Sequence, residues 1–372
     1  MINIKKSEIV SQMKIYKAAI IGLGPSGLAV NKILYGDSSN SIIAFENEDI
    51  NSRDNFFGFW LTEWMKPFEN IIEKKWYKWT IGDNNIKITH SSNDRPYCVI
   101  SFKKWKNYCL ETKNKLEIKN KKVVQYFPIQ NYFKIITIDK NEYYAEKIYD
   151  SRSAKEKKGE LIQHFFGMNI TVADKTFDDN KLTLMHFTNE KNLLHFMYIL
   201  PFTHNKALVE STVFSKETFG NSWYREKIHD YLKHKNISEF KENSTEKGII
   251  PMFFAEEKNS RSAKIFNIGI RGGACKPSTG YAFSFLIKQI QLLKNSKKNY
   301  ASTHKFLERK MDKIFINFLK NNNESGKSFI KLASNLNGNE FQSFMMGESN
   351  LLTKLKIIKS MPKLPFVKEL FK

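Results

Sequence analysis

Residues 17–27 have the sequence KAAIIGLGPSG, and this stretch indicates the class of fold. The apolar run 18–21 predicts a buried strand of a parallel sheet. A GxGxxG motif follows at once, and residues 28–34 then predict a helix. A strand, a glycine-rich turn and a helix in this order are typical of the start of a dinucleotide-binding βαβ unit.

Three glycines and one glutamate carry the chemistry of this motif. Gly22 allows the tight turn, Gly24 lets the backbone approach a pyrophosphate, and Gly27 lets the helix pack on the strand. The helix N-terminus offers free N–H groups to an anion. A second strand is predicted at 41–45, and Glu46 after it can accept hydrogen bonds from a ribose. The alternative is a glycine turn in an α/β unit that holds no ligand.

A second glycine-rich loop lies late in the chain. Residues 265–269 predict a parallel strand, and a helix is expected from about Tyr281. The loop between them contains Gly272 and Gly273, and its N–H groups could contact a flavin ring or its phosphates. The alternative is an ordinary helix-capping loop with a serine or threonine as N-cap. An early GxGxxG motif combined with a late loop of this kind favours FAD over NAD.

Asp150 and Arg152 end another predicted strand, at 147–150. At this position they could orient flavin phosphates or ribityl hydroxyls, and the alternative is a surface ion pair. The eight histidines show no metal-ligand spacing, so no metal site is predicted.

A strand predicted at 207–214 carries a carboxylate in an apolar row. Alternation places Glu210 on the same face as Leu208 and Phe214, and residues 196–202 are expected to pair with this strand. Burial of that kind raises the pKa of a carboxyl group, which can then carry protons near neutral pH. The alternative is a glutamate on an edge strand that points into water.

Composition and charge narrow the class of protein. Of the 372 residues, 41% are hydrophobic and 26% charged, which is typical of a globular chain. The 30 phenylalanines suit a large apolar core and are compatible with an apolar substrate. The net charge of +22 favours anionic partners. No zinc finger, RNA-recognition motif or basic zipper is found, so an anionic membrane surface is a better candidate partner than nucleic acid.

The cysteines and the apolar runs indicate the cellular compartment of the protein. The three cysteines form no CxxC pair, which indicates a reducing compartment and no structural zinc. Residues 1–6 lack the apolar region of a secretion signal, and the run 193–202 is too short to span a bilayer. We therefore expect a cytoplasmic protein, peripheral on the inner face of the cell membrane.

The tail 351–359 interleaves apolar residues with lysines. Leu351, Leu355 and Ile358 share one helical face, with lysines between them. Such a helix could lie on an anionic membrane. The alternative is a basic surface helix that packs on the core.

The chain resembles the lycopene cyclase family, flavoproteins of carotenoid biosynthesis, over nearly its whole length. The most specific motifs are YILPFTHNKALVEST at 198–212 and KPSTGY at 276–281. Further motifs in family order lie at 96–101, 150–152, 163–167 and 248–252.

The resemblance assigns site residues. It implies that the essential glutamate of the family is Glu210 and that the dinucleotide fingerprint comprises Gly22, Gly24, Gly27 and Glu46. The flavin loop of the family corresponds to Pro277, Thr279, Gly280 and Tyr281. The chain departs from the family pattern at Ser211, where many members have an acidic residue, and at Lys276, where histidine is usual. It also departs at 185–186 and at 56–59, and these differences bear on substrate choice and efficiency.

The resemblance implies a lycopene β-cyclase, which forms β-ionone rings by acid/base chemistry without net redox change. Reduced FAD would be the active cofactor, and NAD(P)H would serve only to reduce it. One alternative is a redox flavoenzyme of the same fold, such as a prenyl or carotenoid reductase or a hydroxylase. Another is a non-catalytic carotenoid-binding protein.

The expected fold is α/β, with an FAD-binding Rossmann-like domain interleaved with an antiparallel-sheet substrate domain, plus a helical C-terminal region. The FAD-binding domain is predicted to comprise 15–60, 95–160 and 245–300. The substrate domain is predicted to comprise 61–94 and 161–244. Residues 301–372 are predicted to be helical and able to associate with a membrane.

Overall fold

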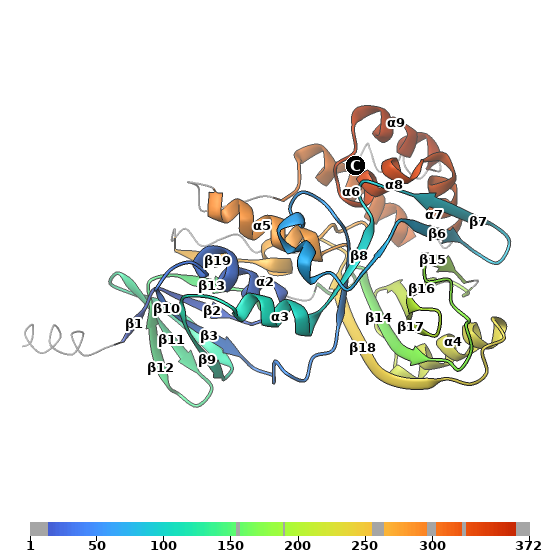
Figure 1. Cartoon of the computed structure of the whole chain (residues 1–372). Helices are drawn as coiled ribbons and strands as arrows, with labels where there is room; N and C mark the ends of the chain where they lie inside the picture. Colours follow the sequence, from blue (N-terminus) through green and yellow to red (C-terminus); the bar gives the residue numbers. More distant parts are fainter. Residues whose placement is uncertain are drawn as a thin grey trace, which may run out of the picture.

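The computed structural model describes residues 14–153, 157–188, 190–254, 264–295, 303–321 and 325–361. The predictions made for residues 1–6 and for 362–372 lie outside these ranges. The described chain combines a parallel sheet, a large antiparallel sheet, two smaller sheets and a group of C-terminal helices (Figure 1).

The βαβ unit predicted at the start of the chain is present. Strand β2 (Ala18–Ile21) leads into helix α2 (Pro25–Ala29), which continues as the π-helix η1 (Val30–Leu34). The parallel sheet has the order β19-β13-β2-β3-β9. Its other strands are β3 (Ser41–Glu46), β9 (Lys115–Asn120), β13 (Ile148–Asp150) and β19 (Ile265–Asn267).

Strand β2 is buried on both faces, which explains its uninterrupted apolar sequence. Ala18 and Ile20 belong to the largest core cluster, together with residues of α2 and of α5 (Phe283–Asn295). Ala19 and Ile21 pack on the opposite side against a four-stranded sheet. That sheet has the order β1-β12-β11-β10 and comprises β1 (Ile15–Tyr16), β10 (Val123–Ile129), β11 (Tyr132–Thr137) and β12 (Glu142–Ala145).

The second large element is a seven-stranded sheet with the order β18-β14-β17-β16-β15-β6-β7, in which only the β6–β15 pair is parallel. The predicted hairpin is formed by β16 (Leu194–Thr203) and β17 (Lys206–Ser215). The other strands are β6 (Lys78–Gly82), β7 (Lys87–Ser91), β14 (Ile162–Thr171), β15 (Lys181–Phe187) and β18 (Lys241–Pro251).

The two faces of this sheet differ. Val209 and Val213 of β17 pack under helix α4 (Asn221–His234), in a separate apolar cluster. Leu208 and Phe214, on the other face, belong to the main core. Glu210 shares the face of Leu208 and therefore points toward the interior between the two large sheets.

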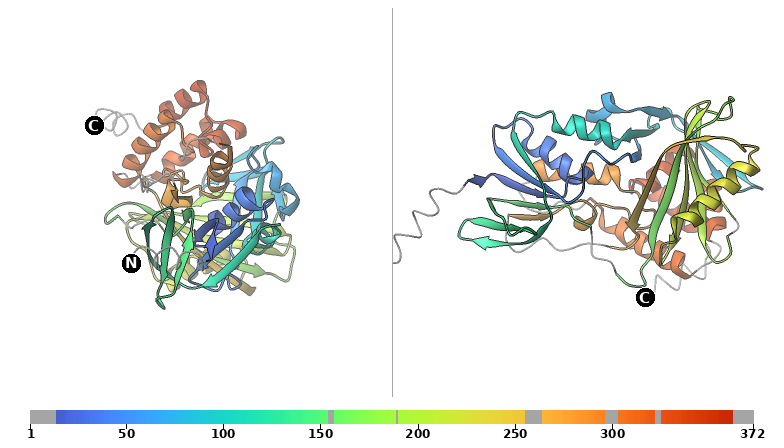
Figure 2. Two further views of the ribbon diagram at one scale, coloured as in Figure 1. Left: turned by 90° about the vertical axis from the view of Figure 1, so that its left-hand side faces the viewer. Right: turned by 90° about the horizontal axis from the view of Figure 1, so that it is seen from below.

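The C-terminal helices lie at the β7 end of this sheet (Figures 1 and 2). They are α6 (Phe306–Asn321), α7 (Ser325–Asn335), α8 (Gly338–Met345) and α9 (Leu351–Ser360). Helix α7 contacts β6, β7 and β16, and α8 contacts β7. Within the described residues, we find no helix with the length and apolar character needed to cross a membrane.

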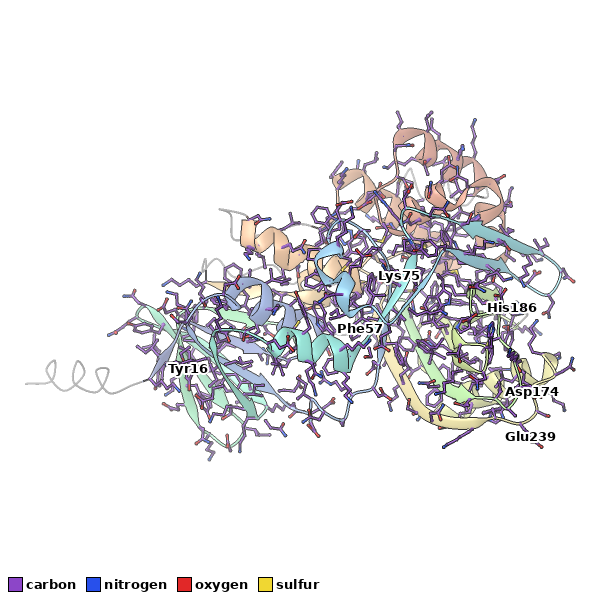
Figure 3. The ribbon with its side chains drawn as sticks, in the orientation of Figure 1. Tyr16, Phe57, Lys75, Asp174, His186 and Glu239 are labelled. Carbon is purple, nitrogen blue, oxygen red and sulfur yellow. The ribbon has the colours of Figure 1, made fainter. Side chains whose placement is uncertain are left out.

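A three-stranded sheet joins the two large sheets. It has the order β4-β8-β5 and comprises β4 (Phe56–Trp60), β5 (Lys74–Trp76) and β8 (Tyr97–Ser101). Helix α3 (Phe102–Leu110) and the 3-10 helix η2 (Lys66–Ile71) flank it. Figure 3 shows Phe57 of β4 in this central region, between Tyr16 at one end and His186 on the antiparallel sheet.

Two predicted domain boundaries run through sheets. Residues 245–251, assigned above to the FAD-binding domain, belong to β18 and pair with β14 of the antiparallel sheet. Strand β4, also assigned to the FAD-binding domain, shares a sheet with β5 of the predicted substrate domain. In both cases hydrogen bonds between strands far apart in sequence place the segment, and local sequence patterns carry no information about them.

Candidate active site

A groove lies at the carboxyl ends of β2, β3 and β13, where open α/β sheets bind ligands. It has a volume of about 780 Å³. The residues that line it are Gly22, Gly24, Glu46, Asn47, Glu48, Arg53, Lys122, Ser151, Arg152, Ser153 and Arg271. Its four basic side chains and the start of α2 suit the phosphates of a dinucleotide.

Two glycines of the motif have the geometry that such a site needs. A Cβ on Gly27 would lie 2.0 Å from the carbonyl oxygen of Gly22, so only glycine allows α2 to pack this closely. A Cβ on Gly24 would meet no atom within 4 Å. The backbone at Gly24 therefore borders open space, which could admit a pyrophosphate.

Glu46 lies at the end of β3 and lines the groove. Its Oε2 accepts the N–H of Leu23 at 2.8 Å, and its Oε1 lies 3.1 Å from Nη2 of Arg53. Its Oε1 also accepts the N–H of Asn47 at 2.8 Å and that of Glu48 at 3.3 Å, so Oε2 is the oxygen that keeps a lone-pair direction for a ribose hydroxyl. Arg53 was not predicted, since it lies in a loop without a motif.

Asp150 ends strand β13, as predicted, and forms an ion pair with Arg152 that is buried at the Asp150 carboxylate. Its side chain is fully buried and lines neither the groove nor the cavity between the two large sheets. It accepts a hydrogen bond from Nη2 of Arg152 at 2.6 Å. The hydroxyl of Tyr126 also donates to it, at 3.1 Å. Asp150 therefore holds Arg152, which itself lines both hollows, and a direct cofactor contact is not favoured for Asp150.

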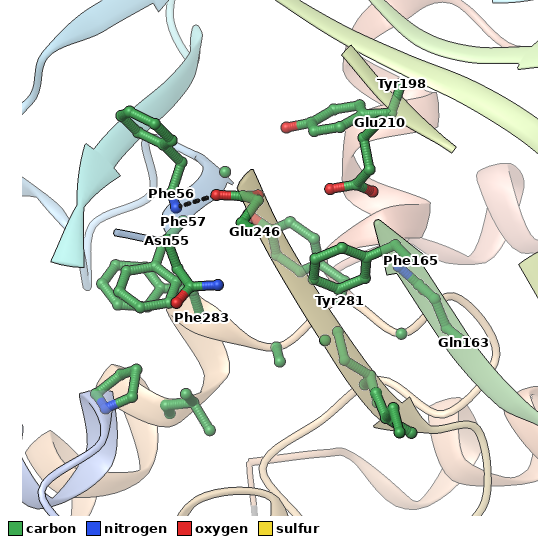
Figure 4. Close-up of a pocket in the computed structure, with 18 of the residues that line it drawn as sticks. Asn55, Phe56, Phe57, Gln163, Phe165, Tyr198, Glu210, Glu246, Tyr281 and Phe283 are labelled. Atoms are coloured by element: carbon green, nitrogen blue, oxygen red, sulfur yellow. Dashed lines mark hydrogen bonds between the residues drawn. The ribbon is translucent and has the colours of Figure 1, made fainter. Parts of the chain in front are cut away.

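A cavity of about 420 Å³ lies between the parallel and the antiparallel sheet (Figure 4). It meets the groove at Gly24 and at 151–153, which line both. Phe57 and Phe283 stack in its wall with ring centroids 4.6 Å apart. Its other apolar lining residues include Phe56, Phe165, Leu184, Met185, Phe196, Leu200, Leu208, Ile250, Ile270, Leu286 and Met345.

The late loop contributes half of its predicted residues to this cavity. Thr279, Gly280 and Tyr281 line it. Gly272, Gly273 and Pro277 line neither hollow. A Cβ on Gly272 would lie 2.2 Å from the carbonyl oxygen of Asn267, and Gly273 has a φ of 78° at the end of the 3-10 helix η3 (Gly269–Gly272). These two glycines shape the turn after β19, and a direct ligand contact is not favoured for them.

Glu210 is 6% exposed and lines the cavity. It lies directly opposite Tyr198 on β16 and opposite Gly167 on β14. The hydroxyl of Thr212 donates to its Oε1 at 2.5 Å. Burial raises the pKa of Glu210 to about 8. The alternative of a glutamate pointing into water is therefore wrong.

Glu246 is a second buried carboxyl group in the cavity, which was not predicted from the sequence. It lies on β18 opposite Gly167, and its Oε2 accepts the N–H of Phe56 at 2.8 Å. Burial, and secondarily the charge of Glu210, raises the pKa of Glu246 well above its usual value. One sequence feature could have indicated Glu246. It lies two residues before Gly248 of the 248–252 motif, and residues two apart on a strand share a face.

A pair of tyrosines completes the polar part of the cavity. The hydroxyls of Tyr97 and Tyr198 are 2.9 Å apart. A Cβ on Gly58 would lie 2.3 Å and 2.5 Å from these two oxygens, so glycine at this position makes room for the pair. Gly58 lies in segment 56–59, one of the departures noted in the sequence.

Met185, of the departure at 185–186, lines the cavity, whereas Ser211 and Lys276 lie away from the reactive groups. Ser211 faces the opposite side of the sheet, where its hydroxyl is 2.8 Å from Nε2 of His195. Lys276 forms a buried ion pair with Asp312 of α6, which also accepts the hydroxyl of Ser278 at 2.6 Å. This pair fastens the late loop to the C-terminal helices.

Three buried polar atoms of cavity-lining residues have no hydrogen-bond partner within the part of the chain that the structure describes: Nε1 of Trp60, Oε1 of Gln163 and Oγ1 of Thr279. A buried polar atom without a hydrogen bond lowers the stability of the folded protein unless a ligand or a water molecule bonds to it. They fit a planar polar ring held beside the Thr279–Tyr281 loop. No cluster able to hold a metal ion is found among the residues described by the structure.

Comparisons with known sequences give a family. A family model described as lycopene cyclase protein matches residues 18–370. A chromoplastic capsanthin/capsorubin synthase of Citrus sinensis is 26% identical over 295 residues, which cover 72% of this chain and 57% of that protein. The chain thus matches less than two thirds of the length of this relative.

Comparisons with solved structures give the fold. A geranylgeranyl bacteriochlorophyll reductase-like protein of Thermoplasma acidophilum has a TM-score of 0.61 at 11% identity and covers 96% of this chain and 99% of its own. Klebsiella pneumoniae HpxO, solved with FAD and uric acid, has a TM-score of 0.58 at 11% identity, and the match covers 93% of this chain and 97% of HpxO. The halogenase PltM, solved with phloroglucinol and FAD, has a TM-score of 0.56 at 9% identity, and the match covers 94% of this chain and 87% of PltM. The predicted fold class, that of FAD-binding α/β flavoenzymes, is therefore confirmed.

Proposed function

The chain belongs to the lycopene cyclase family, and we propose that it converts the linear ends of lycopene into β-ionone rings, forming β-carotene. The reaction rearranges bonds without gaining or losing electrons, so the enzyme would be an isomerase of the intramolecular lyase type. The observation that carries this proposal is the position of Glu210, buried at an apolar cavity that opens into a dinucleotide groove.

Glu210 is suited to supply the proton that starts cyclisation. With a pKa of about 8, it holds a proton at neutral pH and can still release it to a weak base. Protonation of the terminal alkene of lycopene leaves a carbocation. The surrounding phenylalanines keep water from capturing that cation, and their ring faces can stabilise it.

FAD is the cofactor that the site fits best. Gly24, Glu46 and Arg152 would hold its phosphates and ribose, and Gln163 and Thr279 offer unsatisfied polar atoms for its ring. The FAD complexes of HpxO and PltM support this assignment through their shared fold. When bound in its reduced anionic state, the flavin supplies fixed negative charge beside a developing cation. NAD(P)H would serve as its reductant.

A redox flavoenzyme remains the main rival, because the reductase-like, HpxO and halogenase structures share this fold. The two functions differ in their use of NAD(P)H. A reductase or hydroxylase consumes it in proportion to product, whereas a cyclase needs only enough to reduce its flavin.

Expression in a lycopene-accumulating bacterium, followed by chromatography of the pigments, tests the proposed function. We expect β-carotene to replace lycopene. Unchanged lycopene would contradict the proposal, and a hydrogenated or hydroxylated carotenoid would favour the redox rival.

We also propose that the protein binds the cytoplasmic face of an anionic membrane, where an apolar carotenoid would reside. Helix α9 is attached to the protein through Ile357 and exposes Leu351, Leu352, Leu355 and Ile358. Exposed apolar side chains interspersed with lysines are typical of helices that lie in a membrane surface. The net charge of +22 would strengthen attraction to anionic lipid.

A further inference from the structure

Three residues lie in one row across the antiparallel sheet. Gly167 of β14 pairs with Glu210 of β17 on one side and with Glu246 of β18 on the other. Side chains in one row across a sheet share a face. Figure 4 shows both carboxyl groups pointing into the same pocket from their two strands.

Gly167 leaves room between the two glutamates. A Cβ at this position would lie 3.1 Å from Cγ of Glu246, 3.6 Å from Cβ of Glu210 and 3.0 Å from Cδ1 of Leu208. Any other residue would push a side chain between the two carboxyl groups. The row therefore sets two carboxyl groups side by side at the apolar cavity.

We propose that Glu246 is the second proton-transfer residue of the site, which accepts the proton that the substrate releases when Glu210 has supplied one. This proposal rests on the cyclase function proposed above. It assigns a separate side chain to each of the two proton transfers that cyclisation requires.

The proton of Glu210 adds to C2 of the linear end, and C1 becomes cationic. The electron pair of the C5–C6 double bond forms the C1–C6 bond, which moves the positive charge to C5. Glu246 then takes the proton from C6, and the electron pair of that C–H bond forms the C5–C6 double bond of the β ring. One proton has entered the substrate and one has left it. Transfer of a proton from Glu246 back to Glu210 returns both carboxyl groups to their starting states.

The contacts of Glu246 suit an acceptor. Its Oε2 already accepts the N–H of Phe56, a bond that favours the carboxylate form and opposes the burial that raises the pKa of Glu246, and a carbocation in the cavity would favour that form further. The remaining titratable groups that line the cavity are Tyr97, Tyr198, Tyr281, Arg152 and Lys247. Burial raises the pKa of all three tyrosines from an ordinary value of 10.0, far above the 4.5 of a glutamate, so they hold their protons, and neither Arg152 nor Lys247 is a carboxyl group. Among the described lining residues, Glu246 is therefore the base available beside Glu210.

The variant E246Q tests this role, because glutamine keeps an acceptor for the N–H of Phe56 but cannot take the proton. Purified variants with reduced FAD and lycopene would be compared by pigment chromatography, and bound flavin would be measured from its absorbance. E242Q is a matched control, since Glu242 lies on the same strand but pairs with Arg225 at the surface.

We expect E246Q to retain flavin and to form β rings at least about 100-fold more slowly. Its remaining product should shift toward ε and γ rings, because the C5 cation then loses a proton from C4 or from its methyl group. E246D, with a carboxylate of shorter reach, should recover part of the β-ring rate. E242Q should match the wild type in rate and product.

Several outcomes would overturn the proposal while the cyclase function stands. One is E246Q with the rate and product ratio of the wild type. Another is a slower E246Q whose ratio of β to ε and γ rings is unchanged, since that indicates a structural role. If E246Q lost its flavin, E246D would decide, and an E246D variant that bound flavin and was slower with an unchanged ratio of β to ε and γ rings would overturn the proposal. A wild-type protein that formed no ring at all would instead refute the proposed function, and this proposal with it.

Discussion

Tyr198 lies directly opposite Glu210 in the ladder between β16 and β17, and its hydroxyl is 2.9 Å from that of Tyr97. Burial raises the pKa of both tyrosines, so their hydroxyls stay protonated at neutral pH. Burial also raises the pKa of Glu210, but only to about 8. Of these three groups, Glu210 is therefore the one whose proton can move near neutral pH.

The first prediction concerns the pH dependence of ring formation. Glu210 acts as an acid only while it is protonated, so the rate should fall as the pH rises above its pKa of about 8. A single ionisation lowers the rate about tenfold for each further pH unit. The rate would be measured between about pH 6 and about pH 10 with the flavin kept reduced. A rate that stayed level across this range would show that another group supplies the proton.

The second prediction concerns stability. The pKa of Glu210 is about 8 when folded and near the ordinary value of 4.5 when unfolded. The stability that its protonation contributes is therefore full below about pH 4.5 and is lost as the pH rises toward 8, at about 1.4 kcal/mol per pH unit. Urea unfolding of the wild type and of Glu210→Gln at several pH values would measure the difference. The variant should lack this part of the slope, and equal slopes would place the carboxyl group of Glu210 in water.

The third prediction concerns the gap at Gly167. Gly167→Ala adds a methyl group that would lie 3.0 to 3.6 Å from Leu208, Glu246 and Glu210. Because this displaces the reacting carboxyl groups, we expect ring formation to fall about 10- to 100-fold with flavin still bound. Gly220→Ala is the control, since a Cβ there would lie 3.7 Å from its nearest neighbour, a side-chain oxygen at the start of α4. Equal rates in both variants would mean that the spacing of the two carboxyl groups is unimportant.

The fourth prediction concerns the ion pair of Lys276 and Asp312, whose side chains are each 2% exposed. Replacing one partner leaves a buried charge alone, so Lys276→Met should lower the free energy of unfolding by about 3–5 kcal/mol. The double variant Lys276→Met with Asp312→Leu should lose much less. Urea unfolding would measure both. If the double variant were as unstable as the single one, an uncompensated charge would not be the cause.

The fifth prediction concerns α9. Replacing Leu351 and Leu355 by aspartate should reduce sedimentation with anionic vesicles, because the apolar contact is lost and negative charge is added. Ile138→Asp is the control, because Ile138 is 62% exposed but lies in the four-stranded-sheet region. If the α9 variant bound as tightly as the control, another surface would have to carry the attachment.

Local patterns were sufficient to predict the dinucleotide unit and the hairpin of Glu210. Residues 18–21 form a short apolar run before the glycines, and the alternation in 207–214 shows which side chains share a face with Glu210. Both signals depend on neighbours within a few positions, which a sequence displays directly.

Glu246 and Asp150 show where such prediction ends. Strand β18 begins with the polar residues 241–247, so it lacks the apolar alternation that marks a half-buried strand. Its place beside Glu210 depends on pairing through β14, which lies about eighty residues earlier. Asp150 could be placed near the cofactor groove by its strand, but the sequence does not show that its side chain turns toward Arg152 and Tyr126. The division into domains and the roles of the site residues stay predictions.

The central claim is that Glu210 supplies the proton for a cyclisation without net redox change. The most direct test combines the purified protein, reduced FAD and lycopene in the absence of oxygen, and compares the wild type with Glu210→Gln. Glu217→Gln is the control, because Glu217 is exposed just beyond the same strand. We expect β-carotene from the wild type and the control without matching consumption of NAD(P)H. Glu210→Gln should keep its flavin and form rings about 10²- to 10⁴-fold more slowly. β-Carotene formed by Glu210→Gln at the wild-type rate would contradict this account.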